Sequence, residues 1–333
     1  MGDRHVAVNT VGPTEGDLAF RRQELKGRGD ENTYAGATSF LRRNYSRDLT
    51  GVDVVVTGIP FDSATSNRPG ARFGPRGIRE ASAMLAELAG YPFGFDPLEE
   101  LAIIDYGDCH LDYGHPTAVV ERVEAHAAEI LAGDALMVSL GGDHFVTYPL
   151  LKAHANKHGP LALIHFDAHC DTWADDGVRL DHGSMFLRAA NEGIIDPAHS
   201  VQTGIRTPNS SDHGFTVLGA PWVHREGIPA VLDVIRETVG DHKAYLTFDI
   251  DCLDPAFAPG TGTPVVGGLS TAQALEAIRG LDDLNIVGMD VVEVAPHYDT
   301  AQITALAAAT IVHDFLCVLA VRNGSVRSDY GRI

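Results

Sequence analysis

Aspartate and histidine residues gather in three segments of this sequence, at spacings that could bind metal ions. The segments are Gly141-Gly142-Asp143-His144, Asp167-Ala168-His169-Cys170-Asp171 and Asp249-Ile250-Asp251-Cys252-Leu253-Asp254. A lone aspartate usually caps a turn, and a lone histidine is more often structural than a ligand. Because three such segments occur in one chain, chance explains them poorly, and we interpret them as parts of one site.

The second and third segments place acidic or imidazole side chains at every second position. In extended backbone such positions project to one side, so Asp167, His169 and Asp171 are expected to converge, as are Asp249 and Asp251. The intervening residues, cysteines among them, would point into the packing. This argues against the cysteines as ligands.

Converging carboxylates repel one another in a dry cleft unless a cation neutralises them. The four converging aspartates and the two histidines of these segments, His144 and His169, exceed what one tetrahedral ion needs. They suit two divalent ions that share carboxylates. Oxygen-rich ligands with some imidazole favour Mn²⁺, although nickel, cobalt or zinc could also bind. The expected chemistry is therefore metal-assisted hydrolysis.

Other acids in the sequence have different interpretations. Glu293 interrupts an apolar run, so it either needs a buried structural partner or binds a cation in the site. Asp143, Asp254 and Asp290 are interpreted as structural or supporting acids. Most of the remaining carboxylates are expected to be solvated surface.

The elements that position these residues follow from apolar runs of strand length. The runs are 52–59, 101–104, 135–140, 161–166, 245–248 and 285–294, with shorter candidates at 200–205 and 221–224. Continuous runs indicate strands buried on both faces, and helix-length segments such as 117–131 and 271–279 lie between them. We therefore predict a parallel sheet with helices on both faces, whose strands carry the site at their carboxyl ends.

Two helix features are specific. Ser270 and Gln273 form a capping-box signature at the start of 271–279. Residues 303–321 are almost entirely apolar but are interrupted by a histidine and an aspartate, so we predict a buried C-terminal helix rather than a membrane span.

Composition limits the class of protein. The 333 residues are 44% hydrophobic, which excludes a disordered or collagenous chain, and the four cysteines form no C-x-x-C pair. Against 25 Lys and Arg stand 45 Asp and Glu, a net charge of −20, so neither nucleic acid nor a membrane is an expected partner. No secretory signal opens the sequence, and a cytoplasmic location is expected.

The chain divides unequally. Residues 1–35 lack hydrophobic periodicity, and we predict an N-terminal arm that is mobile or contacts another subunit. Residues 36–333 are predicted to form a single catalytic domain, because no linker or internal repeat divides them.

These motifs resemble those of the ureohydrolases, the family of arginase and agmatinase, and most of all its bacterial agmatinases. The resemblance spans about residues 52–319; segment 249–264 is its most specific motif, and 70–75 and 288–293 support it. It implies a three-layer α/β/α fold around an eight-stranded parallel sheet and a homotrimer or homohexamer. It also implies two Mn²⁺ ions per subunit and hydrolysis of a guanidino compound to an amine and urea, with agmatine giving putrescine.

The resemblance also implies residue roles. It carries over six metal ligands: His144 and Asp171 for one ion, His169 and Asp251 for the other, and Asp167 and Asp249 bridging both. Asp167 is also expected to be a catalytic residue. So are Glu293, which would hold the guanidinium, and His182, which would relay a proton to the leaving amine. Thr263 is expected to steady the edge of the site.

Loops 172–184 and 206–214 are expected to contact the substrate's tail, which is the part of the molecule beyond the guanidino group. Asp181 and two neighbouring acids favour a cationic tail such as that of agmatine, whereas Arg179 could bind a carboxylate. The alternative is therefore a guanidino-acid hydrolase of the guanidinobutyrase or guanidinopropionase type. A catalytically silent homologue and a single-metal deacetylase-like site are both disfavoured by the full ligand set.

Overall fold

The structure is a computed structural model that describes residues 25–27 and 32–326. Its centre is one sheet in which every pair of neighbouring strands is parallel. The strands are β1 (Asn44–Tyr45), β2 (Val54–Gly58), β3 (Ile103–Asp108), β4 (Leu136–Leu140), β5 (Ala162–Phe166), β6 (Val201–Ile205), β7 (Thr216–Gly219), β8 (Ala244–Asp249) and β9 (Ile286–Val292). Four of these strands, β2, β5, β6 and β8, are buried along their whole length, as the continuous apolar runs predicted.

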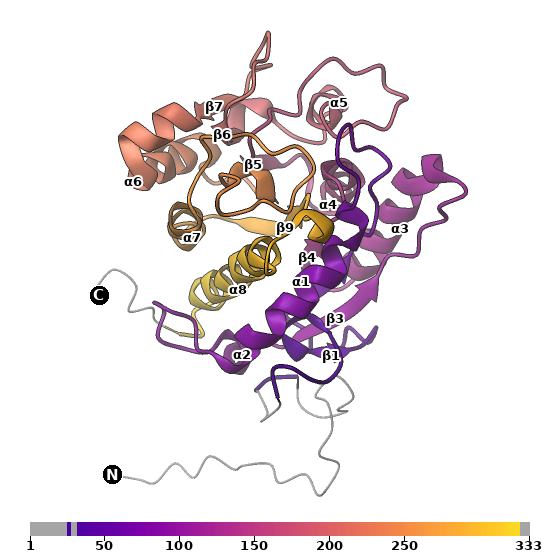
Figure 1. Ribbon diagram of the computed structural model, residues 1–333, viewed down its shortest axis with the longest axis vertical. Coiled ribbons are helices and arrows are strands. Elements are labelled where there is room, and N and C mark those ends of the chain that lie inside the picture. Colours follow the sequence, from indigo (N-terminus) through magenta and orange to yellow (C-terminus); the bar gives the residue numbers. More distant parts are fainter. Residues whose placement is uncertain (1–24, 28–31, 327–333) are drawn as a thin grey trace, which may run out of the picture.

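Eight α-helices accompany the sheet within the described residues. They are α1 (Gly74–Ser82), α2 (Pro97–Glu100), α3 (Val119–Leu131), α4 (Thr147–His158), α5 (Met185–Asn191), α6 (Ala220–Val239), α7 (Thr271–Arg279) and α8 (Ile303–Arg322). Figure 1 shows α6, α7 and α8 on one side of the central strands and α3 and α4 on the other. Each side has its own apolar cluster against the sheet, so the three-layer α/β/α fold is confirmed.

The strand order is β1-β3-β2-β4-β9-β8-β5-β6-β7. The predicted count of eight strands is therefore one too few, a small difference that comes from β1 at the sheet edge. This two-residue strand pairs with β3, and it has no apolar run that could have revealed it. The predicted strand at 221–224 was also wrong, because those residues lie in α6 and the edge strand is β7.

Two helix predictions are confirmed. At the start of α7, Ser270 and Gln273 exchange both hydrogen bonds of a capping box. Helix α8 is long and apolar enough to cross a membrane, but 78% of its most apolar window is buried inside the protein, as in the core helix of a globular domain. Most of the predicted N-terminal arm, residues 1–35, lies outside the described residues, so the arm stays a prediction.

Candidate metal centre

The three segments and Glu293 follow four strands that lie side by side. In the sheet order, β4, β9, β8 and β5 are consecutive neighbours. The glycine–aspartate–histidine segment follows β4, Asp167 follows β5, Asp249 ends β8, and Glu293 follows β9. Because all four strands are parallel, their carboxyl ends bring these residues to one edge of the sheet.

The local backbone that presents the carboxylates is not extended, which corrects the predicted reason for their convergence. The Asp167 carboxylate accepts a hydrogen bond from the backbone amide of His169 at 2.6 Å, and the Asp249 carboxylate accepts one from Asp251 at 2.8 Å. Each first aspartate therefore caps a tight turn that brings the next polar side chain round. Asp171 completes its segment with a left-handed φ of +51°, which is rare for a residue with a Cβ.

Gly142 allows the segment after β4 to approach its neighbours closely. A Cβ added at this position would lie 1.7 Å from the carbonyl oxygen of Phe61. The Gly142 carbonyl in turn accepts a hydrogen bond from the backbone amide of Glu293 at 2.8 Å. The glycine thus joins the β4 and β9 ends of the site, because a residue with a side chain would not fit there.

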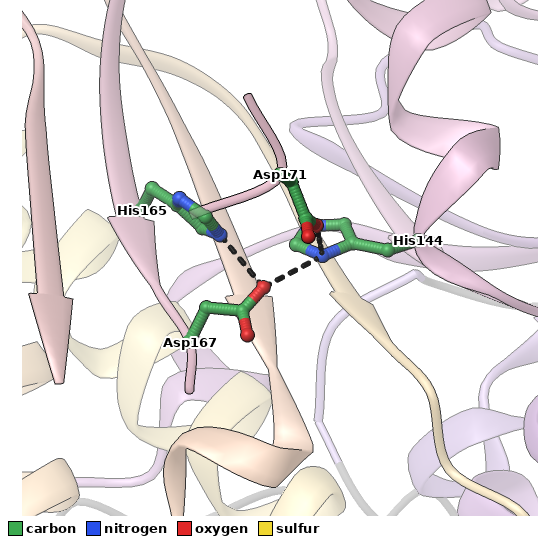
Figure 2. A group of neighbouring side chains, drawn as sticks. All are labelled: His144, His165, Asp167 and Asp171. Atoms are coloured by element: carbon green, nitrogen blue, oxygen red, sulfur yellow. Dashed lines mark hydrogen bonds and ion pairs between the residues drawn. The ribbon is translucent and has the colours of Figure 1, made fainter. Parts of the chain in front are cut away.

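The buried side chains form two clusters that share Asp167. In the first, His144 Nδ1 lies 3.0 Å from Asp167 Oδ2 and 2.8 Å from Asp171 Oδ2 (Figure 2). In the second, His169 Nδ1 lies 3.3 Å from Asp167 Oδ1 and 3.2 Å from Asp251 Oδ2. Both clusters have the composition and spacing of a metal site, and His165 also lies within the first one.

The remaining predicted ligand, Asp249, joins the first cluster. Its Oδ2 lies 3.2 Å from His144 Nδ1, and its other oxygen accepts the amide of Asp251. The hydroxyl of Thr263 donates to Asp251 Oδ2 at 3.1 Å, which places it at the edge of the second cluster as expected.

The hydrogen bonds around His144 show that this cluster fits a cation. Thr247 donates its hydroxyl proton to Asp290, so its oxygen accepts from His144 Nε2, 2.9 Å away. With its proton on Nε2, His144 directs the Nδ1 lone pair at carboxylate oxygens, and Nδ1 has no well-aligned hydrogen-bond partner in the described part of the chain. A lone pair facing carboxylates is satisfied by a metal ion, and the outer bond that fixes the tautomer is typical of metal-binding histidines.

The pKa shifts within the clusters also indicate a site for positive charge. Burial raises the pKa values of Asp171, Asp249 and Asp251, and repulsion by neighbouring carboxylates, Asp167 among them, adds to the rise. Burial acts to lower the pKa of His169, but Asp251 and Asp167 overcome this and raise it to about 12. The cluster therefore binds positive charge strongly, either as protons or as metal ions.

Glu293 and His182 lie beside the clusters. The left-handed φ of Glu293, +63°, turns its carboxylate so that Oε1 accepts from the backbone amide of His144 at 2.9 Å and pairs with His182 Nδ1 at 2.8 Å. The second oxygen, Oε2, is buried and has no hydrogen-bond partner in the described residues. A Cβ at Gly262 would stand 3.1 Å from Oε2, so the glycine keeps the approach to this oxygen open.

Opposing interactions determine the protonation of His182. The backbone amide of Ser66 donates to Nε2 at 3.1 Å, which favours a neutral ring. Burial also acts to lower the pKa of His182, but the hydrogen bond to Glu293 outweighs it and raises the pKa to about 9. This balance suits a group that must both take up and release a proton.

The charged residues of loop 172–184 are occupied by one another. Arg179 is paired with Asp181 at 2.6 Å, and both side chains reach solvent. Asp175 is buried against Arg188, and Asp176 caps its own loop. The structure therefore does not bring Arg179, Asp181 or the neighbouring acids into the clusters. The charged side chains that were expected to contact the substrate's tail instead form ion pairs and hydrogen bonds that stabilise the loop.

Three residues close to the site were missed in the sequence. His165 lies within β5 with Nε2 2.8 Å from Asp167 Oδ2, and Thr247 and Ser66 contact His144 and His182 as described above. His165 stands two positions before Asp167, so the same spacing argument could have found it. Ser66 is 116 residues from His182, and nothing in the sequence connects them.

Parallel strands that deliver two carboxylate-linked clusters define a metal-dependent hydrolase, and the comparisons place it in a family. A family model described as the arginase family matches residues 52–317. An agmatinase from Chromobacterium violaceum is 62% identical over 313 residues, covering 93% of this chain and 97% of the relative, and an Enterobacter agmatinase is 52% identical over 298 residues, covering 89% and 97%.

Solved structures agree with the sequence comparison. A Burkholderia thailandensis protein described as a hypothetical agmatinase superposes with a TM-score of 0.92 at 59% identity, covering 93% of this chain and 99% of that chain. The proclavaminate amidino hydrolase of Streptomyces clavuligerus gives 0.82 at 40% identity, covering 87% and 99%. The chain belongs to the arginase family, and it is a metal-dependent amidinohydrolase.

Proposed function

We propose that this enzyme hydrolyses agmatine to putrescine and urea with two Mn²⁺ ions per subunit. The observation that carries the proposal is the pair of clusters sharing Asp167, with Glu293 Oε2 beside them, a buried oxygen without a hydrogen-bond partner in the part of the chain that the structure describes. His144 and Asp171 would hold one ion, and His169 and Asp251 would hold the other. Asp167 and Asp249 would be shared by both ions. Two such ions supply a nucleophilic water near neutral pH.

The chain's own groups would position the guanidinium and move a proton. Glu293 presents a buried carboxylate oxygen, Oε2, that has no hydrogen-bond partner among the described residues, and a guanidinium has N–H donors that match it in charge and geometry. Glu293 would thereby orient the substrate carbon towards the clusters. His182, which contacts Glu293 and Ser66, would relay a proton to the leaving amine.

Agmatine is the favoured substrate because the similar proteins named above include agmatinases at 52–62% identity. The guanidino-acid alternative depended on Arg179, and the ion pair with Asp181 leaves that alternative without support. The neighbouring acids do not support the cationic tail either, since they too are engaged within the loop. The identity of the substrate's tail is therefore proposed from sequence similarity, whereas the binding of its guanidinium group is proposed from the geometry of the site.

The cellular setting belongs to the same proposal. Production of putrescine would place the enzyme in polyamine biosynthesis in the cytoplasm, and the family resemblance favours a homotrimer or homohexamer. Mass measurement in solution, with and without residues 1–35, tests both the assembly and a role of the predicted arm in it.

A substrate panel tests the function directly. Purified enzyme loaded with Mn²⁺ is assayed for urea release from agmatine, arginine, guanidinobutyrate and guanidinopropionate. We expect agmatine to have the highest kcat/KM and the activity to disappear after chelation. Faster turnover of arginine or of a guanidino acid would contradict the substrate assignment, and full metal loading without any urea release would contradict the enzymatic function.

A further inference from the structure

His165 is a buried histidine that touches the shared carboxylate of the site. It lies in β5 with no exposed side-chain surface, and its Nε2 is 2.8 Å from Asp167 Oδ2 (Figure 2). Its ring packs edge-on against His144 and Phe186, at centroid distances of 5.2 and 4.7 Å. The ring is therefore fixed in place, and its chemical effect depends on which nitrogen carries the proton.

A glutamine on the neighbouring strand decides the position of that proton. Gln202 of β6 is directly opposite His165 in the strand register. Its Nε2 lies 2.5 Å from the carbonyl oxygen of Cys170, and because a carbonyl only accepts, the amide nitrogen must face it. The same nitrogen is 3.2 Å from His165 Nδ1, so Nδ1 accepts and the proton sits on Nε2.

His165 is thereby made a hydrogen-bond donor to Asp167. The Asp167 carboxylate is held at both oxygens, since Oδ1 accepts the His169 amide at 2.6 Å and Oδ2 accepts from His165. These two bonds set the plane of the carboxylate so that one oxygen faces His144 and the other faces His169. Each cluster then receives one oxygen of the shared group.

We propose that Gln202 and His165 form a positioning pair that orients the bridging carboxylate, and that His165 is not itself a metal ligand. This inference rests on the proposed two-metal function. Both ring nitrogens of His165 are already engaged, one with Gln202 and one with Asp167, whereas His144 Nδ1 faces carboxylate oxygens with no well-aligned hydrogen bond among the described residues. Outer partners of this kind tune metal affinity by holding the ligand in its binding geometry.

Three variants separate a positioning role from ligation. His165→Phe keeps a ring but removes the donor. His165→Gln can place an amide N–H where Nε2–H lies, but it is a far poorer metal ligand than imidazole. Gln202→Leu removes the group that fixes the tautomer. His126→Phe is the control, because it removes a buried imidazole that hydrogen-bonds to Thr57 rather than to any residue of the clusters.

Mn²⁺ affinity and stoichiometry are measured by equilibrium dialysis with metal analysis, alongside the melting temperature of each metal-free variant. We expect the affinity of His165→Phe to fall by about 10- to 100-fold. His165→Gln should stay within about threefold of wild type while keeping two ions, and Gln202→Leu should fall between the two. The control should bind as wild type does even if it melts earlier.

The other outcomes overturn the inference. Wild-type affinity in His165→Phe would show that Asp167 needs no such donor. Loss of one ion from both His165 variants alike would make His165 a ligand. Wild-type protein that binds fewer than two ions would overturn the proposed function together with this inference, whereas normal wild-type loading with unaffected variants would overturn the inference alone.

Discussion

At the scale of single residues, the site depends on groups whose hydrogen-bond partners are already assigned. Asp167 joins the two clusters, and His144 is fixed by Thr247 so that its Nδ1 lone pair faces carboxylates. Glu293 uses one oxygen for structure and leaves the other unpartnered among the described residues.

Glu293→Gln tests the proposed guanidinium contact. The amide oxygen of glutamine can still accept from the His144 amide and from His182, but the negative charge is lost. A hydrogen bond to a charged group contributes about 1.5–3 kcal/mol, so we expect kcat/KM for agmatine to fall by roughly 10- to 100-fold. Steady-state urea assays measure the loss.

The control for this variant is Glu192→Gln, which removes an acid that pairs with Tyr148 away from the site. It should leave kcat/KM unchanged. Mn²⁺ content should be normal in both variants. Undiminished activity of Glu293→Gln would rule out the charged contact.

Arg179→Ala tests the discarded interpretation of the tail. Because Arg179 is exposed and paired with Asp181, its loss should change kcat/KM by less than about twofold for agmatine and for guanidinobutyrate. The two substrates are compared in one assay series. A selective loss with guanidinobutyrate would restore Arg179 as a carboxylate-binding residue.

At the scale of elements, the site is made by how closely strand ends approach one another. The turn after β4 passes against Phe61 at Gly142 and accepts a hydrogen bond from the segment after β9. The two aspartate-capped turns after β5 and within the β8 end bring the other ligands round. In each turn, the carboxylate that faces a cluster also accepts a backbone amide of the turn.

Gly142→Ala should disrupt this approach. The added methyl would overlap the Phe61 carbonyl, which belongs to the backbone and can only move with its segment. Overpacking of this kind costs about 1–3 kcal/mol, and we expect at least that loss in the free energy of unfolding, together with weaker Mn²⁺ binding. Urea denaturation and metal titration measure the two effects.

Gly133→Ala is the matched control, because the nearest atom to its Cβ would be 3.8 Å away. Its free energy of unfolding should stay within about 0.5 kcal/mol of wild type. If both glycine variants behaved alike, close approach at Gly142 would not be what builds the turn.

At the scale of the whole molecule, stability, metal and pH are linked through the buried acids. The chain carries a net charge of −20, and two divalent ions would bring it to −16. Without metal, protons on the histidines compensate the clustered carboxylates: the pKa of His169 is raised from 6.5 to about 12 after its attraction to Asp251 and Asp167 overcomes burial. Metal ions would displace these protons.

The sign of the pH effect follows from that rise. The unfolded chain loses the His169 proton near pH 6.5, whereas the folded, metal-free chain keeps it to higher pH. The proton therefore stabilises the metal-free protein fully below pH 6.5, and this stabilisation declines as the pH rises towards the folded pKa. Mn²⁺ replaces the proton, so the increase in melting temperature on adding Mn²⁺ should grow between pH 6 and 9. Melting curves with Mn²⁺ and with a chelator measure it; a constant or shrinking increase would contradict the linkage.

The sequence by itself determined the parallel α/β class, the two helix predictions and which residues gather at the site, because buried strands and aspartate–histidine spacings leave local signals. The β1 edge strand left no such signal, and the strand expected at 221–224 is part of α6. Only the tertiary structure decided that Arg179 pairs with Asp181, that Ser66 meets His182 and that Gln202 fixes His165. These contacts join distant segments or depend on the direction in which a loop side chain turns, and neither is encoded in spacing along the chain.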